Sequence, residues 1–367
     1  MFHDAGTQFG YVSERQIQKS KGAGIKLLVL TSAVSLNPET CKALREFVAN
    51  GGIVLADLCP GVWDDHGAYQ SPGQLDDLFG VKRDERFKFK TMVSDWGVGT
   101  FETEPDFNIK GQWFIGQYYE DTLQTSDGHA LGKHIFGKTK PPAFVFKRTG
   151  KGITILMNYL ETEYRRVPEH WQQTLVEELL RLAKIESPVI TRDVMRNSEI
   201  VFVGRRIFRW QDGPARYVGI LLDEGRHIEL EFKNSGHIYE LASGQYLGKG
   251  NTAKADLRDA PHALFAILPY KIDGLVVKAG SSSRVRGLAL DIRIETGTKP
   301  ARHVVHLDVF RPDGSKCHPL IRNVVLKNGR WTGALPLALN DPTGRWTVVA
   351  REVVSGKEKK VAVRVKE

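Results

Sequence analysis

Residues 24–61 read GIKLLVLTSAVSLNPETCKALREFVANGGIVLADLCPG, and this stretch decides the fold. Its two short apolar runs, 25–30 and 53–58, have the length and composition of strands that are buried on both faces. Between them, Asn37 is followed by proline and is a good helix N-cap, and apolar residues then recur every three or four positions. Gly51 and its glycine neighbour suit the end of this helix. The stretch therefore predicts a strand, a helix and a second, parallel strand joined by a right-handed crossover.

The same stretch carries a family resemblance. The sequence LVLTSAVSLNPETCKALREFVANGGIVLADLCPGVWDDHG, at 28–67, resembles the domain that follows the catalytic barrel in glycoside hydrolase family 42 β-galactosidases. In that family this is the trimerisation domain, and its fold is that of the class I glutamine amidotransferases. The resemblance covers about the first half of the chain and implies a flavodoxin-like parallel sheet. It rests on the strand that ends in Thr31-Ser32-Ala33, the helix that ends in Asn50-Gly51-Gly52, and the Pro60-Gly61 turn before Asp64-Asp65-His66-Gly67.

The beginning of the chain fits this fold poorly. Residues 2–6 have the pattern of the last turn of a helix, and 9–13 (FGYVS) that of a short strand. A flavodoxin-like sheet has the strand order 2-1-3-4-5, and no residues remain here to form its first strand. One hypothesis is that the chain is the C-terminal part of a longer polypeptide. The alternative is a rearranged sheet in which 9–13 pairs directly with 25–30.

Further along, the pattern changes from mixed to all-β. We expect a short helix at 72–79, strands at 87–89, 101–103, 144–146 and 153–157, and an amphipathic helix at 169–184. Ser187-Pro188 then marks a boundary, followed by short strands at 200–203, 217–222, 228–232, 238–241 and 264–268. After a second boundary near Lys271, strands are expected at 289–294, 304–310, 324–326, 346–350 and 361–365.

The sequence thus predicts a multidomain chain of an α/β domain followed by two β-sandwiches. The predicted domains are residues 1–187, 188–271 and 272–367, and the last is immunoglobulin-like, with explicit turns such as Lys327-Asn328-Gly329. The sequences HLDVFRPDGSKCHP and LALNDPTGRWTVVAREVVSGK are similar to β-sandwich modules of large bacterial glycosidases and macroglobulin-like proteins.

Composition excludes several functional classes. Lysine and arginine exceed aspartate and glutamate by 52 − 43 = 9, but the basic residues are scattered, which argues against a nucleic-acid partner. Three cysteines are too few and too far apart for a disulfide framework or a zinc site. No run of about 20 apolar residues and no signal-peptide pattern is present, so we expect no membrane partner. The sequence does not determine the location, and a cytoplasmic one is the default.

Cys59 is the sharpest catalytic candidate. In class I glutamine amidotransferases a nucleophilic cysteine sits at the turn after a strand of this kind, and Cys59 occupies about that place. Pro60, however, removes the backbone N–H that would serve an oxyanion hole. The family's histidine, two residues before a glutamate, follows the last strand, where this chain has Asn158-Tyr159-Leu160-Glu161. We therefore interpret Cys59 as a degenerate elbow position and expect no catalytic residue.

The polar residues near the C-terminal end of the second strand are candidates for binding. Asp57, Asp64, Asp65 and His66 cluster where doubly wound folds place their ligands, with Asp76 and Asp77 nearby. A solvated aspartate-rich turn is the plainer interpretation. Nothing in the sequence would raise the pKa of one carboxyl above that of another, as the two carboxyls of a glycosidase require. In the family it resembles, the catalytic glutamates lie in the barrel, which this chain lacks.

Histidines and aromatic residues add weaker candidates. His66, His129 and His134 match no metal-binding spacing, so no metal and no cofactor is expected. A sugar-stacking platform is one interpretation of the aromatic residues Trp63, Trp96, Trp113, Tyr118 and Tyr119, and a hydrophobic core is the other.

The sequence favours a non-catalytic C-terminal portion of a family 42-like glycoside hydrolase. We expect it to serve subunit assembly as a homo-oligomer, with the α/β domain helping to wall the active site of a neighbouring barrel. Two alternatives stay open. One is a carbohydrate-binding or scaffold protein, and the other is a stand-alone hydrolase that uses Cys59 or the Asp57 loop.

Overall fold

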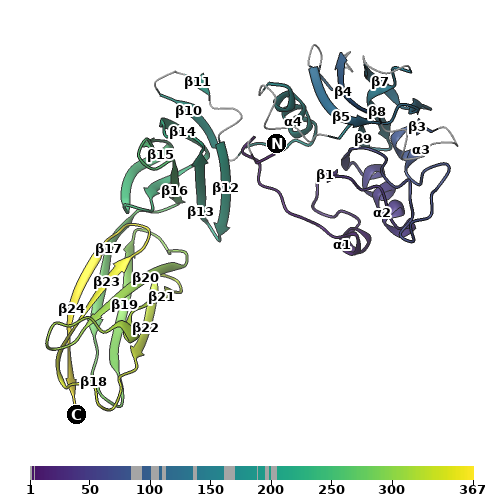
Figure 1. The fold of residues 1–367 in the computed structure, drawn as a ribbon. Coiled ribbons are helices and arrows are strands. Elements are labelled where there is room, and N and C mark those ends of the chain that lie inside the picture. Colours follow the sequence, from purple (N-terminus) through teal and green to yellow (C-terminus); the bar gives the residue numbers. More distant parts are fainter. Residues whose placement is uncertain are drawn as a thin grey trace. The chain divides into compact units, whose positions relative to one another are not determined.

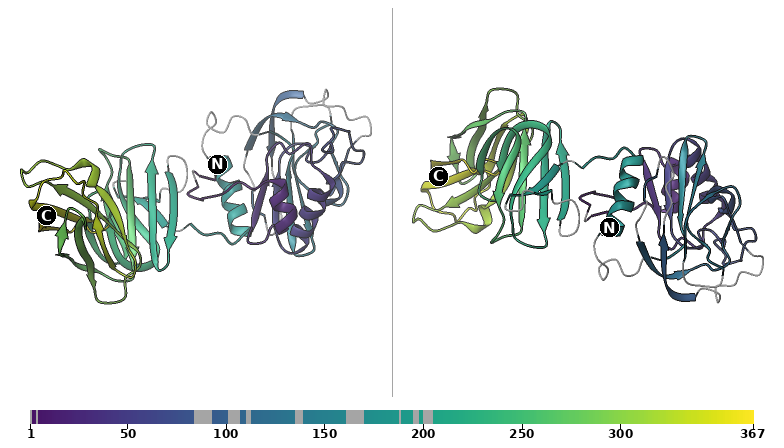
Figure 2. Two further views of the ribbon diagram at one scale, coloured as in Figure 1. Left: turned by 90° about the horizontal axis from the view of Figure 1, so that it is seen from below. Right: turned by 90° about the horizontal axis from the view of Figure 1, so that it is seen from above.

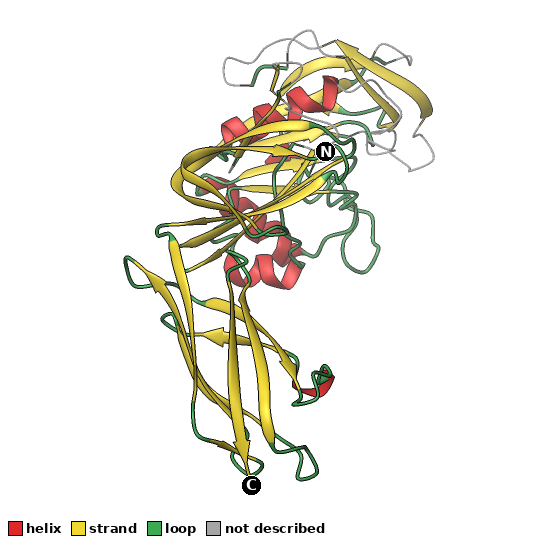
Figure 3. Ribbon diagram, turned by 90° about the vertical axis from the view of Figure 1, so that its left-hand side faces the viewer, coloured by secondary structure: helices red, strands yellow, loops and turns green. Residues whose placement is uncertain are grey.

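The structure is a computed structural model of the chain, and it divides into two compact units. The first unit comprises residues 1–5 and 9–186, and the second comprises 6–8 and 187–367. The structure describes residues 2–3, 5–83, 93–100, 107–109, 113–134, 139–160, 170–187, 189–194, 198–199 and 205–367. Of these, residues 93–100, 113–117, 170–173 and 198–199 are described by their backbone alone. Helices concentrate in the first unit and strands dominate the second. Figure 3 draws the helices in red and the strands in yellow.

The first unit is built on one mixed sheet of seven strands in the order β1-β2-β9-β8-β7-β4-β5 (Figure 1). Strands β1, β2 and β9 are parallel, and each of the remaining neighbours is antiparallel. A separate pair, β3 with β6, is also antiparallel. The strands are β1 (Leu27–Leu30), β2 (Ile53–Ala56), β3 (Val81–Lys82), β4 (Val93–Thr100), β5 (Trp113–Tyr119), β6 (Gln124–Thr125), β7 (His129–His134), β8 (Pro142–Thr149) and β9 (Gly152–Met157).

The described α-helices of this unit are α1 (Glu14–Ser20), α2 (Pro38–Ala49), α3 (Asp76–Phe79) and α4 (His170–Leu182). The prediction for α2 is confirmed in detail, because the side chain of Asn37 accepts a hydrogen bond from the backbone N–H of Thr40, as an N-cap does. Helix α3 is shorter than predicted and ends at Gly80, whose φ is 69°.

The prediction for the N-terminal segment is wrong in two places. Residues 2–3 and 5–6 form turns instead of the end of a helix, and 9–13 form no strand, so 9–13 does not pair with β1. Ser13 instead caps α1, a helix that the sequence analysis did not predict. The backbone N–H of Gln16 donates to Ser13 Oγ (3.3 Å) and that of Ser13 to Gln16 Oε1 (2.8 Å). This reciprocal capping box satisfies donors that would otherwise be unpaired, so the chain begins a helix at Glu14.

The two faces of the sheet bury separate cores, and α2 and α4 cover opposite faces (Figure 2). In β2, Val54 and Ala56 face α2, whereas Ile53 and Leu55 face α4, as the alternation of a strand requires. The end of α2 lies so close to the first residue of β9 that a Cβ on Gly152 would overlap the backbone carbonyl oxygens of Val48 and Gly52.

The second unit begins with one curled sheet of seven strands. The order is β11-β10-β14-β16-β13-β12, with β15 paired to β14, and all of these pairs are antiparallel. Two separate strands were predicted at 228–232 and 238–241, but the structure has one continuous strand, β14. Its pairing with β15 shifts register at two points. The strands are β10 (Val189–Asp193), β11 (Ser198–Glu199), β12 (Arg205–Asp212), β13 (Ala215–Leu222), β14 (His227–Glu240), β15 (Gln245–Asp256) and β16 (His262–Leu268).

The second unit ends in a sandwich of two sheets. One sheet has the order β17-β19-β22, and the other has β18-β24-β23-β20-β21. Trp346 is fully buried between them, and its indole N–H donates to the carbonyl oxygen of Pro342 at 2.9 Å. The elements are β17 (Ile272–Ala279), β18 (Ser282–Ser283), β19 (Leu288–Thr296), β20 (His303–Phe310), η2 (His318–Leu320), β21 (Arg322–Leu326), β22 (Arg330–Leu335), β23 (Gly344–Glu352) and β24 (Glu358–Lys366).

The core of the sandwich continues into the preceding sheet. One cluster of buried residues includes Tyr239 and Leu268 of the curled sheet together with Ile272 and the sandwich strands. The hydroxyl of Tyr239 also accepts a hydrogen bond from the backbone N–H of Ile272 at 2.8 Å. The predicted boundary near Lys271 therefore falls where apolar packing is continuous.

The predicted fold class is confirmed: a mixed, partly parallel sheet with helices precedes two curled, mainly antiparallel β-structures. Most of the predicted strands of the second unit lie within observed strands. The strands predicted at 87–89, 101–103 and 200–203 lie outside the described residues, as does the start of the helix predicted at 169–184.

Candidate functional site

The candidate site lies at the C-terminal ends of β1, β2 and β9, where Asp57 directly follows β2. Its Oδ1 accepts a hydrogen bond from the backbone N–H of Ser32 at 2.6 Å, and the side chain is buried. Burial raises the pKa of Asp57 to about 6, against the opposing effect of the Ser32 hydrogen bond. Asp57 therefore fastens the end of β2 to the turn after β1, and its carboxyl is closed off from solvent.

Cys59 has the backbone of a nucleophile elbow without its chemistry. Its φ is +54°, in the left-handed region that non-glycine residues rarely adopt. The thiol is 1% exposed and donates to Oε2 of Glu120 at 3.5 Å. Burial raises the pKa of Cys59 strongly, and the nearby Glu120 adds to this effect. A thiolate, the form that attacks electrophiles, is therefore strongly disfavoured.

Asn158 lies where the class I glutamine amidotransferases have their histidine, and its role here is structural. Asn158 Oδ1 accepts from the backbone N–H of Glu120 at 2.9 Å, and its Nδ2 donates to the carbonyl oxygens of Glu120 and Pro142, both at 3.0 Å. A buried histidine, His134, is close, and its Nε2 lies 2.9 Å from the carbonyl oxygen of Asn158. Burial lowers the pKa of His134 to about 4, so its ring is neutral at pH 7. Residue 161 lies outside the described residues.

A buried ionic cluster that the sequence did not reveal surrounds Cys59. Arg83 Nε lies 3.0 Å from Oε2 of Glu120, and its Nη1 contacts Oδ1 of Asp76. The three side chains are at most 4% exposed. Burial raises the pKa of Glu120 despite the opposing charge of Arg83, and Glu120 Oε1 has no hydrogen-bond partner among the described residues. Because Glu120 is distant from Asp76 and Arg83 in sequence, no local motif could have indicated this cluster.

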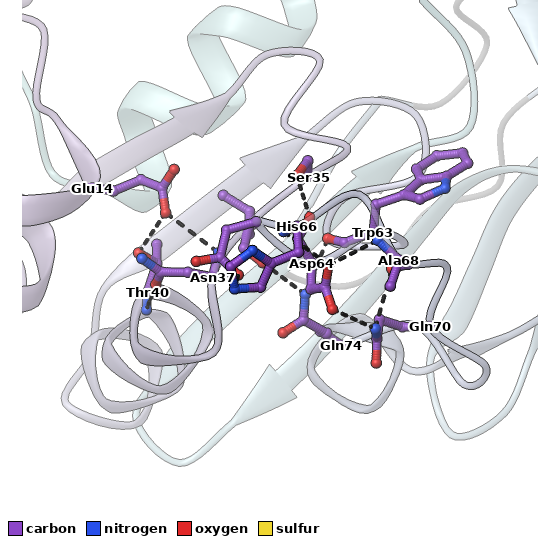
Figure 4. A network of polar contacts seen from close by, with 12 residues as sticks. Glu14, Ser35, Asn37, Thr40, Trp63, Asp64, His66, Ala68, Gln70 and Gln74 are labelled. Atoms are coloured by element: carbon purple, nitrogen blue, oxygen red, sulfur yellow. Dashed lines mark hydrogen bonds and ion pairs between the residues drawn. The ribbon is translucent and has the colours of Figure 1, made fainter.

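Asp64 organises the loop that follows, as Figure 4 shows. Its Oδ1 accepts from the backbone N–H groups of His66 (3.0 Å) and Ala68 (2.8 Å), and its Oδ2 accepts from Nε2 of Gln70 (3.0 Å). Ser35 Oγ donates to the carbonyl oxygen of Asp64 at 2.6 Å and so ties this loop to the segment after β1. Asp64 is thus occupied in shaping its own turn.

The remaining predicted binding residues are exposed. The side chains of Asp65 and His66 are 49% and 89% exposed, and Oδ1 of Asp65 lies 4.0 Å from Nε2 of His66. The four predicted binding residues therefore have three different settings: Asp57 is buried, Asp64 is bound within its loop, and Asp65 and His66 face solvent. None of these settings forms a pair of carboxylates across a cleft.

The aromatic candidates also differ in their exposure to solvent. The rings of Trp63 and Tyr69 meet edge to face, with centroids 5.9 Å apart, and both side chains are partly exposed. Tyr118 is 37% exposed, whereas Tyr119 is buried and stacks on His134 at 4.3 Å. The side chains of Trp96 and Trp113 lie outside the description. Among the described residues no cluster of metal-ligating side chains occurs, and none of the described helices is long and apolar enough to cross a membrane.

No family model and no curated protein matches this sequence. Solved structures do match the fold, and three of them are β-galactosidases that each give a TM-score of 0.54 over 72% of this chain. They are Gan42B, described as a GH42 β-galactosidase from G. stearothermophilus (15% identity), the enzyme of Bacillus circulans sp. alkalophilus (12%), and the cold-adapted enzyme of Rahnella sp. R3 (12%).

The match covers 34–36% of each of those longer chains and lies in the C-terminal portion of the family 42 enzymes. The chain thus spans about a third of the length of the structures it matches. At these identities the likeness shows the fold, and it does not assign an activity to any residue described above.

Proposed function

We propose that this chain acts as a non-catalytic portion of a family 42-like glycoside hydrolase and that its role is subunit assembly. The observation that carries this proposal is the fold match, which covers 72% of the chain and only the C-terminal third of the β-galactosidases. In this proposal the α/β unit corresponds to the trimerisation domain and helps to wall the active site of a neighbouring catalytic domain.

The chemistry of the candidate site supports a role without catalysis. A hydrolase based on Cys59 needs a thiolate and a base within hydrogen-bond reach. Here the described side-chain partner of Cys59 is the carboxyl of Glu120, and burial holds the thiol protonated. A hydrolase based on Asp57 needs access to solvent, and that carboxyl is buried against Ser32.

Two measurements on the purified chain test the proposal. We expect no hydrolysis of chromogenic galactosides or glucosides above a blank, and a defined oligomer in light scattering. A monomer at all concentrations would contradict the assembly role. Hydrolysis that is lost in Cys59→Ala or Asp57→Asn would favour the stand-alone hydrolase instead.

A carbohydrate-binding function is the second candidate, and the Trp63–Tyr69 pair favours it. Partly exposed aromatic rings beside polar groups are suited to stacking on sugars, and Asp65 and His66 lie exposed in the same loop. Calorimetric titration with galacto- and gluco-oligosaccharides tests it. If binding occurs, Trp63→Ala should abolish it, and Tyr118→Ala, which alters an exposed aromatic residue outside this loop, should not.

A further inference from the structure

Strand β1 has one open side. It is the terminal strand in the described order of its sheet, with β2 as its neighbour. On the inner side the carbonyl oxygen of Lys26 accepts from the N–H of Ile53 at 3.0 Å. Because successive residues of a strand direct their backbone groups to alternate sides, Leu27 and Val29 direct theirs away from β2. In the part of the chain that the structure describes, these two residues pair with nothing on that side.

Within Leu27–Leu30 this edge carries no proline, no charged residue and no bulge. Its sequence is LLVL, and its register with β2 runs without a bulge from Leu27 opposite Ile53 to Leu30 opposite Ala56. Natural edge strands are commonly interrupted by proline, lysine or a bulge, since an open and apolar edge is a template for another strand. Leu27 and Val29 are also only partly buried.

The same unit displays a strand-like segment that belongs to no sheet. Residues 9–12 read FGYV, immediately before the capping residue of α1. Phe9, Tyr11 and Val12 are 45%, 92% and 39% exposed, and the rings of Phe9 and Tyr11 meet edge to face at 5.6 Å. Aromatic and β-branched residues favour strands, and their exposure here leaves apolar surface uncovered. The segment and β1 are each four residues long.

We propose that residues 9–12 of one copy of this chain add to the open edge of β1 in a second copy. The exchange gives the outward backbone groups of Leu27 and Val29 their partners and covers Phe9 and Tyr11. When every copy donates its segment and accepts another, the assembly closes and no copy keeps an open β1 edge. This inference rests on the proposed assembly role, and it names the surface and the partner. Figure 1 shows α1 and β1, which follow the donated segment in the chain.

Cross-linking between two copies tests the exchange directly. The three native cysteines are buried, so a single introduced cysteine is labelled selectively. Chains that carry Tyr11→Cys are mixed with affinity-tagged chains that carry Thr31→Cys, an exposed position just after β1. A short bismaleimide should join tagged to untagged chains. Val285→Cys, which alters an 86% exposed residue of the second unit, replaces Tyr11→Cys as the control and should give no such product.

The double variant with both cysteines in one chain distinguishes the other possible partner. If it cross-links within a monomer while the mixture gives no joined product, the segment pairs with its own β1 and the exchange is refuted. Absence of both products refutes it as well.

A charge in the donated segment gives an independent test. Tyr11 is almost fully exposed, so Tyr11→Asp leaves the fold of each copy intact, yet it places a carboxylate where a ring should be covered. We expect the dissociation constant of the oligomer to rise about tenfold or more, which corresponds to about 1.4 kcal/mol. Leu339→Asp, at a 78% exposed apolar site elsewhere, should leave the constant unchanged.

The outcomes separate this inference from the assembly role on which it rests. If the wild-type chain forms a defined oligomer that Tyr11→Asp does not weaken, assembly stands and strand exchange is refuted. If the wild-type chain is a monomer at every concentration, both are refuted.

Discussion

The Nδ1 atom of His303 lies 2.9 Å from Oε1 of Glu352, and both side chains are buried at the start of β20 and the end of β23. The other ring nitrogen of His303 lies 2.9 Å from the hydroxyl of Tyr270, just before β17. The remaining oxygen of Glu352 accepts two hydrogen bonds from Ser355, both at 2.6 Å. This polar network therefore joins the loop between the curled sheet and the sandwich to the sandwich core.

The network predicts that the second unit loses stability in acid. Burial by itself would raise the pKa of Glu352, but the hydrogen bonds from His303 and Ser355 outweigh it and lower the pKa. A lowered pKa means that the stability contributed by Glu352 is present above its unfolded-state pKa of about 4.3 and is lost as pH falls through the folded value. Glu352→Gln should cost about 3 kcal/mol at pH 7 and flatten this acid dependence. Melting curves at pH 7 and about pH 4 measure both effects, and Glu358→Gln, at an exposed position of β24, is the control.

The raised pKa of Asp57 leads us to expect the opposite pH dependence for the stability of the first unit. Its pKa is raised to about 6, so the folded state binds the proton more tightly than the unfolded state. The stabilising contribution is present below about pH 4 and is lost as pH rises through about 6. Asp57→Asn should therefore be more stable than wild type at pH 7.5 by about 1–3 kcal/mol, with a smaller advantage at about pH 5. Urea unfolding decides this, with exposed Asp65→Asn as the control, and an equal effect at both pH values would contradict it.

Cys59 should resist alkylation. A thiol that is 1% exposed and has a raised pKa presents little thiolate, so iodoacetamide at neutral pH should modify it at least about a hundredfold more slowly than an exposed cysteine. Mass spectrometry of the folded and the urea-unfolded chain measures the contrast. Any hydrolytic activity that the protein shows should survive Cys59→Ala. Rapid, stoichiometric labelling that abolishes such an activity would restore the nucleophile hypothesis.

The capping box of α1 should be measurable by hydrogen exchange. Ser13→Ala removes the acceptor of the Gln16 N–H and should destabilise α1 by about 1 kcal/mol, so its last-turn amides exchange about fivefold faster. Arg15→Ala, at an exposed position of the same helix, should change the rates little. Equal rates in all three proteins would show that packing of Ile17 alone holds the helix.

The second unit should fold without the first. A chain of residues 187–367 should be soluble, rich in β-structure by circular dichroism and cooperative in melting, because its sheets share one buried cluster. For the same reason, residues 188–271 alone should expose Tyr239 and Leu268 and melt without cooperativity. An unfolded 187–367 fragment beside a folded full chain would show that our division is wrong.

The elements that the sequence predicted well are those with strong local signals. The run from Asn37 to Gly52 carries its own cap, apolar stripe and stop, so α2 could be placed almost to the residue. The two strands beside it follow from their apolar runs. In contrast, β15 includes the polar sequence GKGNTAKAD and is a strand only because β14 lies beside it.

The candidate site was predicted less well, because its chemistry depends on distant residues. Cys59 and Asp57 were identified from their place after a strand, but their settings are decided by Glu120 and by the N–H of Ser32. A single sequence does not reveal that Glu120 and Arg83 close over the thiol. The wrong prediction at 9–13 has a different origin, because the aromatic and β-branched residues there favour a strand while Ser13-Glu14-Arg15-Gln16 is a capping-box sequence that begins a helix.

Position 152 should tolerate no substitution of its glycine during evolution. Any Cβ there would meet the carbonyl oxygens of Val48 and Gly52, which belong to backbone and cannot swing aside as a side chain can. Even alanine would have to push α2 off the sheet. In a library of random variants selected for folding, this position should therefore keep glycine alone, while Gly213, where a Cβ meets nothing within 4 Å, has a positive φ as its only restriction.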